Sequence, residues 1–189
     1  MKFRKARIEK FEGSTVYKIP DEIARELGHV IARWANLERH LKLVIYNLVG
    51  IDDVIGRVVI GKARAHEQIG RVEDVLTALR LTVKSPLKEI KKSLAEIESS
   101  RNALAHGQWL ITPGSDQLFL LDLSDNWPLG EGIPRHTKRM FPDTKPVGQG
   151  DLTKLVNDMD LEIERLDKLN EEVRALRRSL HAKSPEQAP

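Results

Sequence analysis

The chain contains no cysteine among its 189 residues. That absence excludes disulfide bonds, zinc–thiolate sites and cysteine nucleophiles, and it fits a reducing compartment such as the cytoplasm. No apolar run approaches the roughly 20 residues that cross a bilayer, and the basic N-terminus lacks the apolar segment of a signal peptide. We therefore expect a cytoplasmic protein that does not enter a membrane.

Aromatic residues are also scarce, at 5% of the chain, against 40% hydrophobic and 31% charged residues. This balance is more typical of a helix-rich protein than of a β-sandwich. The net charge is only +3, which permits contact with nucleic acid but does not require it. The length suffices for one domain with a buried core. Composition alone indicates no function.

Apolar residues recur at steps of three and four, which predicts long amphipathic helices. The first is expected over residues 21–49, closed by Gly50, and a second helical stretch over 54–79 with a break near Gly61. A third runs from Ser85, the expected N-cap, to Gly107, the expected C-cap. A heptad repeat of apolar residues predicts a last helix from Asp151 to about residue 182. Glu162 replaces an apolar residue once, at the second of the two heptad positions.

The fold class predicted from these segments is all-α: an up-and-down bundle of about four long helices over residues 21–182. Residues 1–20 are predicted to form a basic arm or a single edge strand. Residues 108–150 read as an insertion before the last helix, a small β-hairpin followed by a loop rich in proline and glycine. Residues 183–189 are expected to be a disordered tail.

The most distinctive stretch is RNALAHG, residues 101–107, on the last turns of the third predicted helix. Asn102 and His106 are four residues apart, so they lie about 40° apart around the helix and share one face. Arg101 lies about 140° from His106 by the same geometry, although its long side chain can bend toward that face. The spacing permits a polar cluster without requiring one.

This arrangement resembles the R-N-x-x-x-H motif of the HEPN superfamily, here Arg101, Asn102 and His106. The stretch WANLERHL, residues 34–41, is also similar to first-helix sequences of bacterial members, with Glu38 as its polar residue. The resemblance covers roughly residues 21–107 and 151–182 and leaves the insertion at 108–150 unexplained. It implies an all-helical bundle that dimerises through the surface carrying the motif, in a family rich in metal-independent ribonucleases of toxin–antitoxin, phage-defence and RNA-processing systems.

The resemblance implies a catalytic set of Arg101, Asn102 and His106, with Glu38 as a secondary polar contact. The 2′-hydroxyl of RNA would act as the nucleophile, so neither a metal nor another cofactor is expected. His106 would move protons, Arg101 would bind the phosphate, and Asn102 would orient the histidine or bond the phosphate. The expected partners are RNA, a second copy of the chain and an antitoxin protein.

A structural interpretation stands beside the catalytic one. Arginine and histidine near a helix C-terminus are favoured by the helix dipole whatever the function. The chain is then a non-catalytic, dimeric interaction or nucleotide-binding module that associates through the heptad helix, or an antitoxin-like partner. A solvated helix face is the favoured interpretation of His40, Arg64, His66 and Glu67. No second histidine follows His66 at the helical spacing of a zinc motif.

Overall fold

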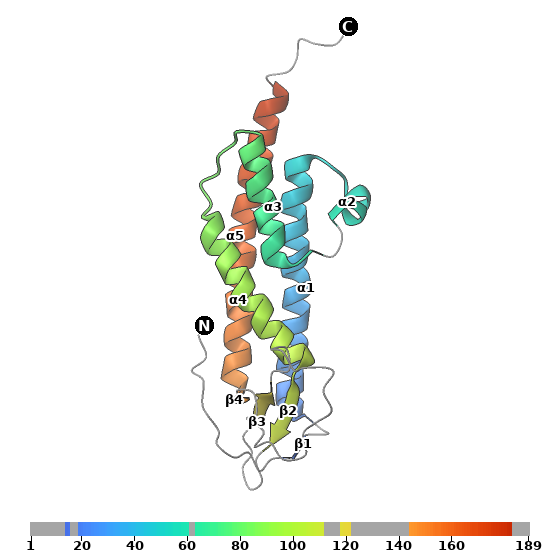
Figure 1. Ribbon diagram of the computed structural model, residues 1–189, viewed down its shortest axis with the longest axis vertical. Helices are drawn as coiled ribbons and strands as arrows, with labels where there is room; N and C mark the ends of the chain where they lie inside the picture. The colour runs from blue at the N-terminus through green and yellow to red at the C-terminus, as the bar shows by residue number, and fades with distance from the viewer. Residues whose placement is uncertain (1–13, 16–18, 61–62, 112–117, 122–143, 183–189) are drawn as a thin grey trace, which may run out of the picture. The chain divides into compact units, whose positions relative to one another are not determined.

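The computed structural model describes residues 14–15, 19–60, 63–111, 118–121 and 144–182 (Figure 1). Five helices lie in this part of the chain: α1 (Asp21–Val49), α2 (Asp53–Ile60), α3 (Ala65–Ala78), α4 (Leu87–His106) and α5 (Gln149–Ala182). Four short strands accompany them: β1 (Ser14–Thr15), β2 (Gln108–Ile111), β3 (Leu118–Leu121) and β4 (Thr144–Pro146). The prediction of a helical bundle is confirmed.

The chain divides into two compact units, and the long helices contribute to both. One unit, called here the sheet unit, consists of residues 1–31 and 99–156. The other, called here the bundle unit, consists of residues 32–98 and 157–189.

In the sheet unit, the four strands form one antiparallel sheet in the order β1-β2-β3-β4. β2 and β3 pair along their whole length, from Gln108 opposite Leu121 to Ile111 opposite Leu118. The sequence predicted the hairpin and, as one alternative for residues 1–20, a single edge strand, which is present as β1. The sheet is larger than predicted because β4 adds to its other edge. Buried residues of this unit come from the helices and the strands; they are Ile23, Val30, Trp109, Leu118, Leu120, Leu152 and Leu155.

In the bundle unit, side-chain contacts link four helical segments. Three polar pairs join α1 to α5: Arg33 with Asp160, His40 with Asp167, and Asn47 with Asn170. Two further pairs, His66 with Glu98 and Glu73 with Lys91, join α3 to α4. The core of this unit contains Trp34, Leu37, Leu41, Val44, Ile69, Val72, Leu76, Ile90, Leu94, Met159, Leu166, Leu169 and Val173.

The helix boundaries follow local signals in the sequence. α1 begins directly after Pro20, whose carbonyl accepts the amide of Ala24 at 2.9 Å. It ends at Val49 because Gly50 adopts a left-handed φ of 73°, a conformation that costs glycine little. The break predicted near Gly61 is confirmed, since α2 ends at Ile60 and α3 begins at Ala65.

Two predicted helix starts are shifted. Ser85 does not cap α4: its hydroxyl donates to Glu172 of α5 at 2.9 Å, and the helix begins at Leu87. The last helix begins at Gln149, two residues before Asp151. The carboxylate of Asp151 accepts a hydrogen bond from the amide of Gly148 at 3.0 Å. Amide groups at the start of a helix have no partner within the helix, and this bond supplies one.

The heptad seam of α5 is filled by this chain. Its members Leu152, Leu155, Met159, Leu166, Leu169 and Val173 are buried, whereas Leu180 near the end of the helix is exposed. The apolar face of the last helix is therefore buried by other residues of the same chain over most of the repeat. The basic arm residues before Ser14, the loop at 122–143 and the tail at 183–189 lie outside the described residues.

Candidate functional site

The motif lies at the corner where α4 leads into the sheet of the sheet unit. α4 ends at His106, and only Gly107 separates it from β2, which begins at Gln108. Since Gln108 is held in register opposite Leu121 of β3, the chain is fixed on both sides of the motif. His106 therefore does not stand on a loosely fraying helix end.

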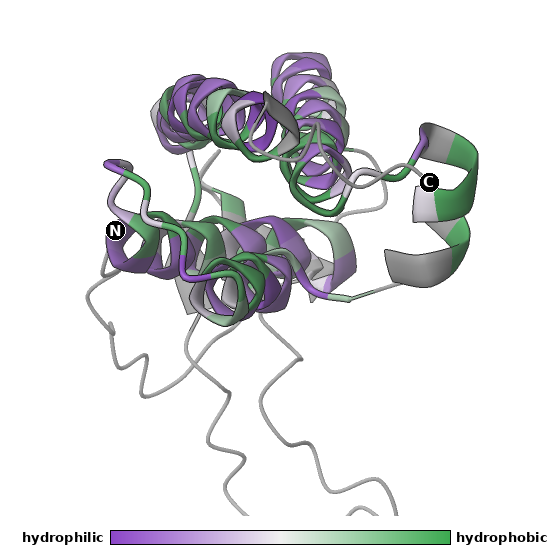
Figure 2. Cartoon of the chain, turned by 90° about the horizontal axis from the view of Figure 1, so that it is seen from above, coloured by the Kyte–Doolittle hydropathy of each residue, from purple (hydrophilic) through white to green (hydrophobic). Residues whose placement is uncertain are grey.

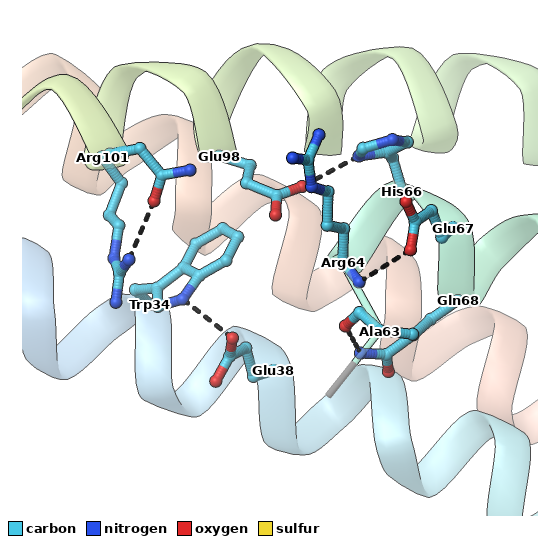
Figure 3. Close-up of polar contacts among 10 residues, drawn as sticks. Trp34, Glu38, Ala63, Arg64, His66, Glu67, Gln68, Glu98 and Arg101 are labelled. Carbon is cyan, nitrogen blue, oxygen red and sulfur yellow. Dashed lines mark hydrogen bonds and ion pairs between the residues drawn. The ribbon is translucent and has the colours of Figure 1, made fainter. Parts of the chain in front are cut away.

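Arg101 and Asn102 contact each other through their side chains. Nη1 of Arg101 donates a hydrogen bond to Oδ1 of Asn102 at 2.9 Å, as drawn in Figure 3. Both side chains are half-buried. The bond orients the Arg101 guanidinium against Asn102, and Asn102 is the residue that shares a helix face with His106.

His106 is exposed on the last turn of α4, beside the half-buried Arg101 and Asn102. An exposed imidazole is accessible to a substrate, and histidine is the side chain that changes charge near neutral pH. A guanidinium is always cationic and presents several N–H donors. The corner thus offers a proton-transfer group and a fixed cation, the two functions that cleavage at a phosphate requires.

Glu38, the predicted secondary contact, belongs to the bundle unit. Its Oε1 accepts a hydrogen bond from the indole nitrogen of Trp34 at 3.0 Å (Figure 3). The two residues are four apart on α1, and Trp34 is buried, so this contact gives the indole N–H the partner that a buried tryptophan requires. Trp34 and Trp109 are both buried.

A second histidine pair was not expected from the sequence. Nδ1 of His66 on α3 lies 2.9 Å from Oε2 of Glu98 on α4 (Figure 3). The interpretation of His66 as part of a solvated helix face is therefore wrong, because its ring is held across two helices. The 32 residues between the partners explain why no local pattern indicated the pair. The solvated-face interpretation is also wrong for His40, whose side chain is 23% exposed and is bonded to Asp167 of α5.

The burial of the Glu162 side chain was also not predicted from the sequence. Glu162, which interrupts the heptad seam, is 2% exposed, and its Oε1 accepts a hydrogen bond from Arg165 at 2.6 Å. Burial raises the pKa of Glu162 above 4.5, and this effect outweighs the lowering by Ser93 and Arg165. Burial therefore favours the neutral form of the Glu162 carboxyl, because a charged carboxylate is costly in a poorly hydrated interior.

Among the described residues, no group of three or more histidine, aspartate and glutamate side chains is arranged to hold a metal ion. Within the same ranges, none of the helices combines the length and the hydrophobicity that a bilayer crossing requires. Comparison of the chain with protein-family models, with curated proteins and with solved structures gives no match. The function of the chain is therefore inferred from the site itself.

Proposed function

We propose that the protein is a HEPN-like, metal-independent endoribonuclease of the cytoplasm, acting at Arg101, Asn102 and His106. The observation that carries the proposal is the 2.9 Å bond between Arg101 and Asn102, which ties a cation to the residue that shares a helix face with the exposed His106. Together with the resemblance to the motif, this bond supports a phosphate-binding site. The alternative is a helix C-terminus at which the dipole alone stabilises basic side chains.

In the proposed reaction, the 2′-hydroxyl of RNA loses its proton and attacks the adjacent phosphorus. The bond to the 5′-oxygen of the next nucleotide breaks, and that oxygen gains a proton. His106 acts in these proton transfers, and Arg101 stabilises the charge that develops on the phosphate oxygens. The products are a 2′,3′-cyclic phosphate end and a 5′-hydroxyl end.

A homodimer completes the proposal. One histidine cannot both accept the first proton and donate the second in a single concerted step, whereas two copies of the motif facing one phosphate supply both groups. A chain of this kind fits a toxin–antitoxin or phage-defence system, with an antitoxin protein as the regulatory partner. Mixed dimers of wild-type and His106→Ala chains are expected to retain much less than half of the wild-type activity per dimer.

The direct test is cleavage of a mixed RNA pool in EDTA by the wild type, Arg101→Gln and His106→Ala. We expect both substitutions to slow cleavage by at least about a hundredfold, the usual contribution of a proton-transfer group or a charge-stabilising donor. His29→Ala is the matched control, because His29 is an exposed histidine on α1 of the same unit. Wild-type rates in His106→Ala would refute the assignment.

A second candidate function is a non-catalytic interaction module, and one observation favours it. Val54, Ile55 and Val58 of α2 are 76%, 51% and 83% exposed, and the apolar colour of this short helix is visible in Figure 2. Such a cluster is a typical mark of a protein contact surface. If so, Val54→Ser with Val58→Ser weakens self-association in sedimentation velocity and leaves the melting temperature unchanged.

A further inference from the structure

The His66–Glu98 pair has a defined direction of hydrogen bonding. Glu98 as a carboxylate only accepts hydrogen bonds, so Nδ1 of His66 must carry the proton in the 2.9 Å contact. In the neutral ring the other nitrogen, Nε2, is then an acceptor. The carboxylate thus selects the tautomer in which Nε2 accepts a hydrogen bond.

The carboxylate of this pair is more buried than the carboxylate of the other histidine–carboxylate pair in the bundle unit. The Glu98 side chain is 13% exposed and that of His66 is 30% exposed. In the comparable pair, Nδ1 of His40 lies 2.6 Å from Asp167, whose side chain is 54% exposed. Water therefore competes more strongly for Asp167 than for Glu98, which strengthens the hold of Glu98 on Nδ1 of His66.

Arg64 adds a cation at the start of α3. It stands directly before α3, where its backbone amide donates to Oε2 of Glu67 at 3.1 Å. Its side chain is exposed and points toward His66 and Glu98 (Figure 3). The start of α3 consequently presents an oriented acceptor, His66 Nε2, together with a fork of N–H donors that suits a phosphate.

We propose that His66, Arg64 and Glu98 form a ribonucleotide-binding site, separate from the motif, that distinguishes RNA from DNA. A 2′-hydroxyl donates to Nε2 of His66, and the neighbouring backbone phosphate bonds Arg64. Glu98 is a positioning residue that keeps Nδ1 protonated. The hydroxyl is the group that deoxyribose lacks, so a fixed acceptor for it favours RNA. RNA as the ligand rests on the proposed function, but the residues belong to a different site.

The test measures binding of one fluorescent 12-nucleotide sequence, as RNA and as DNA, by anisotropy in EDTA. All proteins carry His106→Ala so that no RNA is cleaved. We expect RNA to bind about three- to tenfold more tightly than DNA, the range of one hydrogen bond. His66→Phe should reduce that ratio to about one, whereas Arg64→Gln should weaken RNA and DNA binding equally.

Glu98→Gln examines the positioning role without removing the imidazole. Nitrogen-15 NMR of the histidine side chains should detect the Nδ1–H form of His66, and Glu98→Gln should lower its population together with the RNA-to-DNA ratio. His40→Phe is the matched control and should leave the ratio unchanged. Circular dichroism and melting temperature establish that each variant is folded.

An RNA-to-DNA ratio that His66→Phe leaves unchanged in a folded protein would overturn the inference, as would equal loss in His40→Phe or the absence of RNA binding. The two proposals fail separately. If the wild type cleaves RNA but the ratio is independent of His66, only this site is refuted. If the ratio depends on His66 but the wild type cleaves nothing, only the nuclease is refuted.

Discussion

Replacement of Glu162 by leucine should stabilise the protein. Glu162 is 2% exposed in the seam of α5, and its partner Arg165 is 46% exposed. The Arg165 cation therefore returns to water at little cost when the carboxylate is removed, and leucine fills a seam position that the flanking Leu155 and Leu169 occupy with apolar side chains. Replacing a buried ion pair by a hydrophobic residue of similar volume is commonly stabilising by about 1–4 kcal/mol.

We expect Glu162→Leu to raise the free energy of unfolding at pH 7 by about 2 kcal/mol. In a chain of this size that corresponds to a rise of roughly 4–8 °C in melting temperature. Urea unfolding followed by circular dichroism measures the change. Glu164→Leu, at an exposed position two residues along the same helix, is the matched control and should change stability by less than about 0.5 kcal/mol.

The gain from Glu162→Leu should also depend on pH. Because the folded-state pKa of Glu162 is raised above 4.5, the folded chain holds this proton more tightly than the unfolded chain. The wild type keeps the associated stability below pH 4.5 and loses it as pH rises through the folded pKa. The difference between Glu162→Leu and wild type should therefore grow from pH 4.5 toward pH 8.

The result that would contradict this reasoning is a Glu162→Leu variant less stable than the wild type by more than about 1 kcal/mol, with a difference in unfolding free energy that stays constant over that pH range. It would mean that the carboxylate is ionised and productively paired with Arg165 in the folded chain.

Three further substitutions test backbone features of the bundle unit by chemical unfolding. Arg80 closes α3 with a positive φ of 54°, so Arg80→Gly should stabilise the protein by about 1 kcal/mol once the entropy of glycine is subtracted; a loss would refute the strain. Gly50→Ala should cost about 2 kcal/mol, since it forces a left-handed alanine against the Arg177 guanidinium; wild-type stability would argue against that close approach. Gly56→Ala should cost about 1–3 kcal/mol and speed proteolysis within α2, because the added methyl group meets the buried ring of Tyr46; an unchanged digestion pattern would count against this packing.

The sequence predicted the features that depend on neighbouring residues. The apolar period located the helices, Gly50 ended α1, and the heptad repeat identified the buried seam of α5. The edge strand offered as one alternative within residues 1–20 is present at Ser14–Thr15. Its pairing with β2 could not be predicted, because about a hundred residues separate the two strands. The burial of Glu162 was equally hidden, since a charged residue at a seam position suggests an interruption in packing.

The candidate site shows the same division. The motif RNALAHG placed Asn102 and His106 on one helix face, because helical geometry alone decides that. The direction of the Arg101 guanidinium depends on its bond to Asn102, a rotamer that spacing does not determine. The contact of His66 with Glu98 joins two helices, and the contact of Ser85 with Glu172 joins the segment before α4 to α5, so only tertiary structure reveals them.

The measurement closest to the central claim is the chemistry of the RNA ends. A defined RNA is incubated in EDTA with the wild type or with His106→Ala, and the fragments are weighed by mass spectrometry. The proposed reaction predicts 2′,3′-cyclic phosphate and 5′-hydroxyl ends from the wild type, absent with His106→Ala. Intact RNA from a folded wild type, or 5′-phosphate ends that persist in the variant, would contradict a ribonuclease acting through His106.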